Sequence, residues 1–457
     1  MWSSDASNNL ILSQSTGDVA ATSICPIPDG GFYVSWLDSA NGYSLYLQRL
    51  DVSGNAMWEA NGKLIYHRDI LSFIGYGLSI DSDGNAIVGI DSSVAALHEP
   101  GGRVLAFKIS PAGELLWGST GITLSPSDED VSVVLCCGTS DRGAAFIWGK
   151  LEQEDLIRIT KLDSAGNQLW STSVARDTPD AGLTPTNIVA SDDGSVIYAF
   201  IQVINKMSGT YDSVLAQKLA AGDGANLWGG TPVTVVNSSA ATAVTLPMGE
   251  VPTLISDGAG GAVLGYPLAN NTTQRIFAQR VNPTGQTSYA PNGVLVSGNA
   301  IDASAASFGF YPLSGRLYIA WNANSAGMSG VRAQCVDSTG ALLWDEAGIA
   351  LAAYEPLALM SPVAMLPVAG GVMAAWIQQP PQAAFLPQPL RVSMLDPSGA
   401  PVWQNPVVDL KSSAAHTTDS AVGAVGATGY GAFAWTSNDY TVRAQNINLD
   451  GTLGVAT

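Results

Sequence analysis

Acidic side chains recur at one offset along this chain, eleven residues after a tryptophan, and they are Asp69, Asp128 and Glu355. Other polar side chains accompany them in neighbouring or matching segments, namely His67, Arg68, Asp130, Arg176, Asp177 and Tyr354. Carboxylate oxygens bind hard cations and accept hydrogen bonds from hydroxyl groups, so such a set suits a cation or a polyhydroxylated ligand. These nine residues are the candidate ligand-binding residues. The alternative is that they are solvated loop charges.

No other pattern supports catalysis or a cofactor. The segment Asp81–Asn85 resembles the start of a calcium-binding loop, but the bidentate Glu that should follow is missing, so we interpret it as a turn. The three histidines, His67, His98 and His416, lack paired metal-ligand spacing. No Gly-x-Ser-x-Gly elbow or Gly-rich phosphate loop occurs. We expect no catalytic residue and no cofactor, with structural calcium as the only ion to consider.

A longer phrase surrounds the tryptophans and recurs seven times. Most copies read Asp-x-x-Gly-x-x-x-Trp, as Asp163–Trp170 and Asp337–Trp344 do. The closing aromatics are Trp58, Trp117, Trp170, Trp228, Tyr289, Trp344 and Trp403, and successive ones lie 53 to 61 residues apart. A period kept over the whole chain indicates a tandem repeat of one structural unit.

Each repeat also contains segments with the patterns of β-strands. One is an apolar run after a tight turn, as in Gly371–Trp376, and another alternates, as in Leu47–Leu50. Four such segments separated by Gly, Asp, Asn and Ser turns predict one antiparallel four-stranded sheet per repeat. Such sheets bury both faces when they pack face to face around an axis. The sequence therefore predicts an all-β fold, a β-propeller.

The closing phrase resembles the repeats of quinoprotein-like propellers, which end in a similar Gly-x-x-x-Trp. It is more similar still to bacterial surface repeats that read Gln-x-hydrophobic-Asp-x-x-Gly-x-x-Leu-Trp, as Gln334–Trp344 does. The resemblance covers the whole chain and implies a bacterial extracellular propeller protein whose tryptophans dock on the neighbouring blade. A quinone cofactor is not implied, because the polar ligands that those enzymes need are not found.

The two ends of the chain supply an eighth blade. Gly431–Trp435 and Ala444–Ile447 give strands of a last unit, while Leu10–Leu12 is a surplus apolar segment that follows Trp2. If Trp2 follows Thr457 around a circle, it lies 56 residues after Trp403. We therefore predict a single eight-bladed domain over residues 1–457, whose ring is closed by N- and C-terminal strands in one blade. The predicted blades span residues 19–67, 68–124, 125–176, 177–237, 238–297, 298–352, 353–410, and 411–457 with 1–18.

Loop lengths distinguish the two faces of the predicted disc. Turns between first and second strands are tight, as at Asp29–Gly31, and so are the turns before the tryptophans. Antiparallel connectivity places both sets on one face. The connections between second and third strands, such as Gln378–Leu390, and between blades, such as Arg176–Asn187, are long and lie on the opposite face. We expect the nine candidate residues in the inter-blade loops of this long-loop face, which come nearest the axis.

Charge and composition limit the partners. With 38 acidic and 19 basic side chains, the net charge of −19 repels phosphate backbones and anionic lipids. No apolar stretch approaches the roughly 20 residues that cross a bilayer. We therefore expect neither nucleic-acid binding nor membrane insertion. The first residues lack the basic and apolar regions of a signal peptide, which leaves a cytosolic protein or one whose signal peptide has been removed. Lys-poor, Asn-, Ser-, Thr- and Gly-rich repeats favour the second, an extracellular or cell-surface protein.

Four cysteines are too few for a disulfide scaffold in a chain of this length. Cys25, Cys335 and the adjacent Cys136 and Cys137 are interpreted as small buried residues of strands, and a vicinal disulfide between the adjacent pair is the alternative.

Three classes of function remain. The favoured one is a secreted or cell-surface, non-catalytic binding or adhesion propeller that recognises a glycan or protein through its long-loop face. One alternative is a structural subunit of a larger extracellular assembly or filament. The other is a propeller enzyme, whether lyase, hydrolase or quinoprotein-like. The fold hosts all three, so it cannot choose among them.

Overall fold

The computed structural model describes residues 1–40, 42–67, 75–92, 103–125, 131–150, 156–176, 181–191, 193–204, 211–237, 245–247, 250–270, 273–299, 302–356, 358–379, 388–412 and 420–455. Over these residues the strands form eight antiparallel sheets of four strands each. The eighth sheet combines strands from both termini. This confirms the predicted fold class, an all-β, eight-bladed propeller. The sheets are called blades 1 to 8 in chain order.

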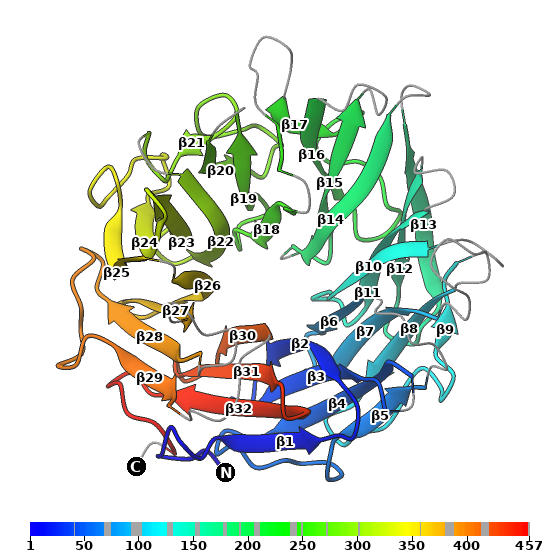
Figure 1. The fold of residues 1–457 in the computed structure, drawn as a ribbon. Coiled ribbons are helices and arrows are strands. Elements are labelled where there is room, and N and C mark those ends of the chain that lie inside the picture. The colour runs from blue at the N-terminus through cyan, green and yellow to red at the C-terminus, as the bar shows by residue number, and fades with distance from the viewer. Residues whose placement is uncertain are drawn as a thin grey trace. The chain divides into compact units, whose positions relative to one another are not determined.

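The chain divides into two compact units, and the first holds residues Met1–His67 and Leu295–Thr457. Its blade 1 consists of β2 (Val19–Pro26), β3 (Phe32–Asp38), β4 (Ser44–Leu50) and β5 (Lys63–Tyr66). Blade 6 consists of β22 (Asp302–Tyr311), β23 (Arg316–Ser325), β24 (Met328–Val336) and β25 (Ile349–Pro356). Blade 7 consists of β26 (Leu359–Val368), β27 (Gly371–Gln379), β28 (Leu390–Leu395) and β29 (Val408–Lys411). Blade 8 consists of β30 (Ser420–Val425), β31 (Gly431–Ser437), β32 (Thr441–Ile447) and β1 (Leu10–Gln14). Their first strands are neighbours, because β22 contacts β26, β26 contacts β30 and β30 contacts β2 (Figure 1).

The second unit, Arg68–Val294, holds blades 2 to 5. Blade 2 consists of β6 (Tyr76–Ile80), β7 (Ala86–Asp91), β8 (Val104–Ile109) and β9 (Ile122–Thr123). Blade 3 consists of β10 (Val131–Gly138), β11 (Ala144–Lys150), β12 (Leu156–Leu162) and β13 (Gln168–Ala175). Blade 4 consists of β14 (Gly182–Ala190), β15 (Val196–Ile204), β16 (Tyr211–Leu219) and β17 (Val233–Asn237). Blade 5 consists of β18 (Thr253–Ser256), β19 (Ala262–Ala269), β20 (Gln274–Val281) and β21 (Val294–Leu295). Again the first strands are neighbours, with β10 between β6 and β14, and β14 next to β18.

The apolar core lies between successive blades, since each sheet has two faces to bury. Met394 and Leu410 of blade 7, for example, pack with Phe433 and Trp435 of blade 8. The middle strands β3, β7, β8 and β31 are buried along their whole length. This explains why their sequences are continuous apolar runs and do not alternate. Burial between blades is therefore the main force that holds each unit together.

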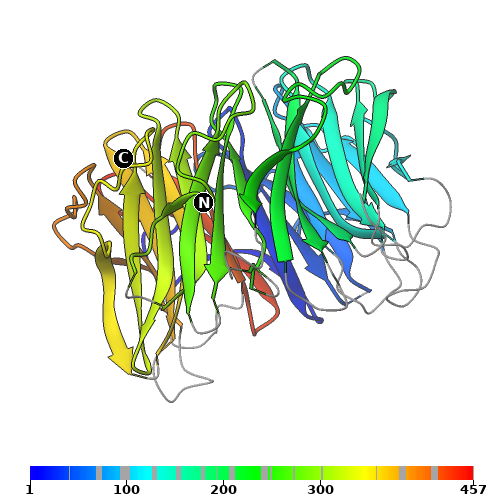
Figure 2. The same cartoon turned by 90° about the horizontal axis from the view of Figure 1, so that it is seen from above.

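Within each blade the strands run in alternating directions. The turn between the first and second strands and the turn between the third and fourth strands therefore lie at the same end (Figure 2). The turn between β2 and β3 is closed by a hydrogen bond from the Ile27 N–H to the Gly31 carbonyl at 2.9 Å, and Gly30 adopts a φ of 94°. Glycine tolerates this left-handed conformation without strain. The turns before the tryptophans lie at the same end, as predicted. We call it the tight-turn end and the opposite one the long-loop end.

The Asp-x-x-Gly phrase forms a side-chain-capped turn. In blade 3 the Asp163 carboxylate accepts hydrogen bonds from the N–H groups of Ala165 and Asn167 at 2.9 and 2.8 Å. Gly166 has a φ of 90°, and a Cβ atom there would lie 3.0 Å from the Trp117 ring of the preceding blade. Glycine is thus needed for both the conformation and the close approach of the indole.

The predicted docking role of the tryptophans is confirmed within both units. Six of the docking tryptophans donate a hydrogen bond from the indole Nε1 to a turn carbonyl of the next blade, over distances of 2.8 to 3.3 Å. The donors are Trp2, Trp117, Trp170, Trp228, Trp344 and Trp403, and all are 4 to 7% exposed. In four blades a glutamine of the third strand orients the docking aromatic. The Gln334 side chain accepts a hydrogen bond from the main-chain N–H of Trp344 at 3.0 Å and donates to the Asp345 carbonyl at 2.7 Å. Gln48, Gln217 and Gln279 make the corresponding contacts.

The seam between the two termini has the predicted form. Strand β1 pairs antiparallel with β32, with Leu10 opposite Ala444. Trp2 fills the docking position of blade 8, and its Nε1 donates to the Val52 carbonyl of blade 1 at 3.0 Å. The circular spacing from Trp403 to Trp2 therefore reflects a real eighth repeat.

The border between blades 6 and 7, predicted approximately at residues 352 and 353, lies a few residues later in the structure. Strand β25 continues to Pro356, with Glu355 opposite Ser329 of β24. The physical reason is the hairpin of β23 and β24, which are joined by only Ala326 and Gly327, with φ of 50° and 78°. Because β24 begins at Met328, it offers extra backbone for β25 to pair with.

Burial supports the cysteine interpretation for three of the four residues, since Cys136, Cys137 and Cys335 are buried and Cys25 is half-buried. Cys136 and Cys137 are both free thiols in β10, and Cys136 packs with the core shared with blade 2, whereas Cys137 packs with the core shared with blade 4. Consecutive side chains of a strand point to opposite faces. Burial raises the pKa of the Cys137 thiol to about 12, which makes it a poor nucleophile.

Candidate functional site

The nine sequence-predicted site residues divide into two groups. His67, Arg176, Tyr354 and Glu355 belong to the described part of the chain. The others lie outside the described residues, and they are Arg68, Asp69, Asp128, Asp130 and Asp177. Their gathering at one face stays a prediction.

His67 follows β5 at the long-loop end of blade 1. Its Nδ1 lies 3.2 Å from the Ser44 Oγ at the start of β4. Ser44 is 1% exposed, so its hydroxyl is closed to a ligand. Arg176 directly follows β13, at the long-loop end of blade 3.

Tyr354 and Glu355 do not lie in an inter-blade loop near the axis, as the sequence had suggested. Both belong to β25, the edge strand of blade 6 farthest from β22. The extended ladder with β24 explains the difference. Tyr354 packs beside Gly330, where a Cβ atom would lie 3.3 Å from the Tyr354 ring, while Glu355 faces the opposite side.

Glu355 lines a pocket of about 450 Å³ between blades 6 and 7, near their long-loop ends. Leu351, Ala352 and Ala353 of β25 line one side together with Glu355. The other side is lined by Trp376, Gln378, Arg391, Val407 and Asp409 of blade 7. This volume lies in the range of small-molecule sites, which is about 300–1,000 Å³.

A chain of charged and polar groups crosses the pocket. The Gln378 amide donates to the Glu355 carboxylate at 2.8 Å, and its carbonyl oxygen accepts a hydrogen bond from Arg391. Arg391 also donates from Nε to the Asp409 carboxylate at 3.1 Å. Gln378 is 8% exposed, whereas the side chains of Arg391 and Asp409 are 32% and 43% exposed. The buried Gln378 amide thus holds the Glu355 carboxylate and the Arg391 guanidinium in fixed positions.

The register of blade 7 explains why these side chains meet. Arg391 is the cross-strand partner of Trp376 on β27 and of Asp409 on β29, so all three side chains lie on one face. Gln378 lies two residues beyond Trp376 and therefore on the same face. The indole Nε1 of Trp376 is buried and has no hydrogen-bond partner within the described residues.

A change in the repeat opens the pocket in this blade. In blade 6 the equivalent Arg332 donates to the main-chain carbonyls of Ala347 and Gly348, both at 2.6 Å. Gly348 follows its docking tryptophan by four residues, and blade 7 has Val407 at that place. There Arg391 bonds instead to the side chains of Gln378 and Asp409.

Gln378, Arg391 and Asp409 were not among the sequence candidates. They are single polar residues inside strands and were hidden by the apolar runs around them. A usable signal does exist, because Trp is paired with Arg across β27 and β28 as it is in three other blades, at Trp148–Arg158, Trp321–Arg332 and Trp435–Arg443. The pairing marks the strand position of Arg391 but does not single this residue out, because the position four residues after the docking tryptophan is Val174 in blade 3 and Ala6 in blade 8.

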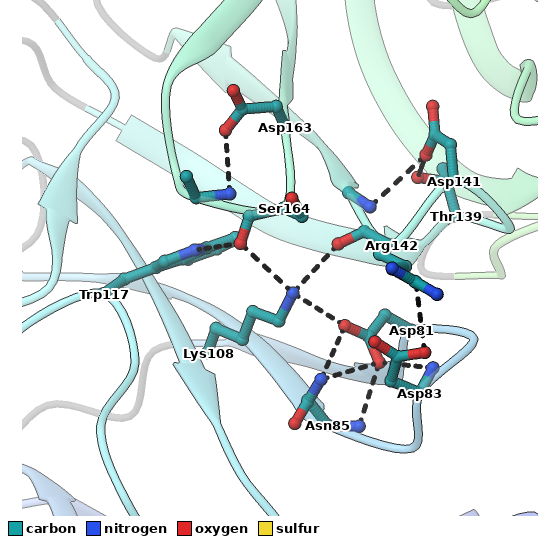
Figure 3. Close-up of polar contacts among 12 residues, drawn as sticks. Asp81, Asp83, Asn85, Lys108, Trp117, Thr139, Asp141, Arg142, Asp163 and Ser164 are labelled. Carbon is teal, nitrogen blue, oxygen red and sulfur yellow. Dashed lines mark hydrogen bonds and ion pairs between the residues drawn. The ribbon is translucent and has the colours of Figure 1, made fainter.

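The tight-turn end of the second unit is closed by buried cations. Figure 3 shows the Lys108 ammonium between the Asp81 carboxylate of its own blade, at 2.8 Å, and the Arg142 and Ser164 carbonyls of blade 3, at 2.9 and 3.3 Å. Asp81 also accepts hydrogen bonds from the Asn85 N–H and amide, as expected for a turn and not a calcium loop. These contacts are structural and lie at the tight-turn end of blades 2 and 3.

Two negative findings concern the described residues. Among them no group of three or more His, Cys, Asp or Glu side chains is arranged to hold a metal ion. Nor is any helix there long and apolar enough to span a membrane.

Comparisons with known proteins found no family and only weak structural likenesses. No protein-family model matches the chain, and a sequence search of curated proteins found no match. Solved structures that resemble it include the Dos1 propeller, with 10% identity, a TM-score of 0.48 and coverage of 96% of this chain and 94% of that one. The propeller domain of the Trilobed protease from Pyrococcus furiosus shows 8% identity, a TM-score of 0.43 and coverage of 86% and 98%. An ulvan lyase of a polysaccharide lyase family shows 9% identity, a TM-score of 0.45 and coverage of 100% and 96%.

The chain also resembles prolyl oligopeptidase B from Galerina marginata, with 12% identity and a TM-score of 0.48. The match covers 93% of this chain but 55% of that one, so this chain spans about half the length of that enzyme. Likenesses this weak carry no inference about ligand or reaction, which must come from the site itself.

The pocket is built for hydrogen bonding. A carboxylate has about four acceptor positions and a guanidinium five donors, so Glu355, Asp409 and Arg391 keep bonding capacity beyond their mutual contacts. Leu351, Ala353 and Val407 also line the pocket. The site therefore presents hydrogen-bond donors and acceptors at fixed positions.

Proposed function

We propose that this protein is a secreted or cell-surface binding propeller that recognises a glycan at the long-loop ends of blades 6 and 7. The observation that carries the proposal is the Glu355–Gln378–Arg391–Asp409 chain across a pocket of about 450 Å³. Sugar hydroxyls both donate and accept, so they match a site in which carboxylates and a guanidinium alternate. Its likeness to bacterial surface repeats supports an extracellular setting.

Non-catalytic binding is favoured by how the charged groups are held. Each carboxylate of the pocket already accepts a hydrogen bond from a neighbouring side chain. These contacts orient both carboxylates as hydrogen-bond acceptors. The best nucleophile–base geometry in the described residues is Ser44 with His67, and its hydroxyl is buried. Binding therefore accounts for the arrangement better than hydrolysis does.

A glycan array probed with and without added calcium tests the proposal. We expect glycans with neutral or amino sugars to bind, because a net charge of −19 disfavours strongly acidic polysaccharides. The affinity for the best glycan is then measured by calorimetry for the wild type and for Glu355→Gln and Arg391→Gln. Loss of one charged hydrogen bond should weaken binding by about tenfold or more.

A matched control is Glu59→Gln. Glu59 pairs with Lys63 at 3.4 Å in the same unit, and its side chain is 62% exposed and outside the pocket. This variant should bind like the wild type. Absence of any glycan binding, or equal affinity in Glu355→Gln and the wild type, would refute the proposed site. Release of shorter sugars during the assay would instead identify an enzyme.

A further inference from the structure

The pocket between blades 6 and 7 contains one carboxylate whose negative charge is not balanced by a cation. Glu355 is half-buried, and its Oε2 accepts a hydrogen bond from the neutral Gln378 amide at 2.8 Å. Within the described residues Glu355 forms no ion pair, and its Oε1 has no hydrogen-bond partner. Partial burial weakens the hydration of a carboxylate, so an unbalanced one favours a ligand that brings a positive charge.

The neighbours of Glu355 on its own blade do not supply that charge. Ser329, its cross-strand partner on β24, is buried and donates its hydroxyl to the Asn322 side chain at 3.0 Å. Asn322 in turn donates to the Met360 carbonyl of blade 7 at 2.6 Å. Both polar side chains are therefore engaged elsewhere, and neither is a cation. Glu355 lines the pocket, so its carboxylate is accessible to a ligand there.

The other two charges of the pocket balance each other. Arg391 forms an ion pair with Asp409, donating from Nε to the carboxylate at 3.1 Å. The Arg391 guanidinium also donates to the Gln378 side-chain oxygen, which places a neutral amide between Arg391 and Glu355. Among the lining residues two carboxylates and one guanidinium leave one net negative charge, and it belongs to Glu355.

An ammonium group suits this arrangement better than a metal ion does. In the part of the chain that the structure describes, no three His, Cys, Asp or Glu side chains come together to hold a metal. A primary ammonium needs only one carboxylate, because neutral acceptors can take its other two N–H donors. Its hydrogen bond to a carboxylate is roughly twice as strong as one between neutral groups. The unbalanced charge therefore favours an ammonium over a hydroxyl at Glu355.

We propose that this pocket selects amino sugars whose amine is free and protonated, in preference to neutral and N-acetylated sugars. The proposal rests on the proposed glycan function and names the class of sugar. The ammonium donates to the Glu355 carboxylate, while hydroxyl groups of the same ring bond to the Arg391 guanidinium and the Asp409 carboxylate. The positive charge of Arg391 repels an ammonium and so fixes this orientation.

Three tetrasaccharides that differ only at C2 of each sugar test the proposal: β-1,4-linked glucosamine, N-acetylglucosamine and glucose. At a weakly acidic pH they carry an ammonium, an acetamide and a hydroxyl at that carbon. Each is titrated into the full chain by calorimetry at physiological salt, where a Debye length of about 8 Å limits attraction to the net charge of −19. We expect the glucosamine tetramer to bind at least about tenfold more tightly than the other two.

Glu355→Gln separates the site from general electrostatic attraction. It removes the negative charge and keeps the size of the side chain. The preference for the glucosamine tetramer over the glucose tetramer should therefore fall below about threefold. The matched control is Glu59→Gln, which changes the net charge by the same amount at a side chain that is 62% exposed and outside the pocket. This variant should keep the full preference.

Equal or tighter binding of the glucose or N-acetylglucosamine tetramer would overturn the inference and leave the proposed glycan function standing. An unchanged preference in Glu355→Gln, or an equal loss of it in Glu59→Gln, would overturn it as well, because the overall charge would then be the cause. Binding of none of the three tetramers also overturns it. The glycan function itself fails only if no glycan of the array binds.

Discussion

Lys161 is the residue that best shows how a buried charge joins two blades. Its side chain is fully buried and its ammonium lies 2.5 Å from the Asp141 carboxylate, while two further donors reach carbonyls of blade 4. Removing one partner of a buried ion pair leaves groups without partners and costs more than the pair contributes. The lysine therefore links blades 3 and 4 through specific hydrogen bonds.

We predict that Lys161→Met lowers the free energy of unfolding by about 2–4 kcal/mol at pH 7, measured by urea denaturation. The matched control Lys63→Met removes an exposed pair, with side chains 25% and 62% exposed, and should cost less than about 0.5 kcal/mol. Equal effects of the two substitutions would show that burial of the ammonium is not what matters.

The same pair predicts a pH dependence. Burial would raise the pKa of Asp141, but hydrogen bonds from Lys161 and Thr139 and the charge of Lys161 outweigh it and lower the pKa below the ordinary 3.8. A carboxyl group with a lowered folded-state pKa stabilises the fold above its unfolded-state pKa, and this stabilisation is lost as the pH falls through the folded-state value. The stability difference between wild type and Lys161→Met should thus be constant from about pH 7 to 5 and shrink below about pH 4. A difference that grows on acidification would contradict this assignment.

Trp344 stabilises the junction between blades 6 and 7. It is 7% exposed and donates to the Pro397 carbonyl at 3.3 Å. Trp344→Ala should cost about 3–5 kcal/mol in thermal or urea unfolding, because it leaves a cavity and an unpaired carbonyl. The preceding Leu343 is 40% exposed, and Leu343→Ala serves as the control with an expected cost below about 0.5 kcal/mol. A cost under about 1 kcal/mol for Trp344→Ala would mean that the docking role is misassigned.

At the scale of elements, strand β1 and strand β25 show how far the sequence predicts this fold. The position of β1 was predictable because Trp2 completes a seven-copy spacing, which is a pattern of residue types. The extent of β25 was not, because it depends on the two-residue hairpin at Ala326 and Gly327, which lengthens β24. The candidate site could be predicted only in part for the same reason, since its geometry depends on strand register. Glu355 was found by its offset, but Gln378, Arg391 and Asp409 meet it only through strand register.

Deletion of residues 1–13 should destabilise the protein strongly. It removes most of β1 and with it Trp2, and it exposes the edge of β32, which pairs with β1 through Leu10 and Ala444. We expect the melting temperature to fall by roughly 5–10 °C in differential scanning calorimetry. The point variant Ile11→Ser, at a position 48% exposed on the same strand, should lower it by less than about 2 °C. An unchanged melting temperature after the deletion would mean that blade 8 does not need β1.

For the molecule as a whole, structure and binding are assigned to opposite ends of the blades. Docking indoles and buried lysines occupy the tight-turn end, where turn carbonyls of successive blades lie close together. The pocket with Glu355 and Arg391 opens at the long-loop end of blades 6 and 7. A scaffold of regular turns at one end allows the other end to vary, which is how repeat proteins gain new binding surfaces.

A crystal structure of the protein soaked with the best-binding glycan tests this account most directly. We predict electron density for a sugar between blades 6 and 7, with hydroxyl groups within hydrogen-bonding distance of the Glu355 and Asp409 carboxylates and the Arg391 guanidinium. A soak of Arg391→Gln under the same conditions should leave that pocket without sugar density. Density at the tight-turn end, or at a surface where none of these three side chains touches the glycan, would contradict the assignment of the binding site.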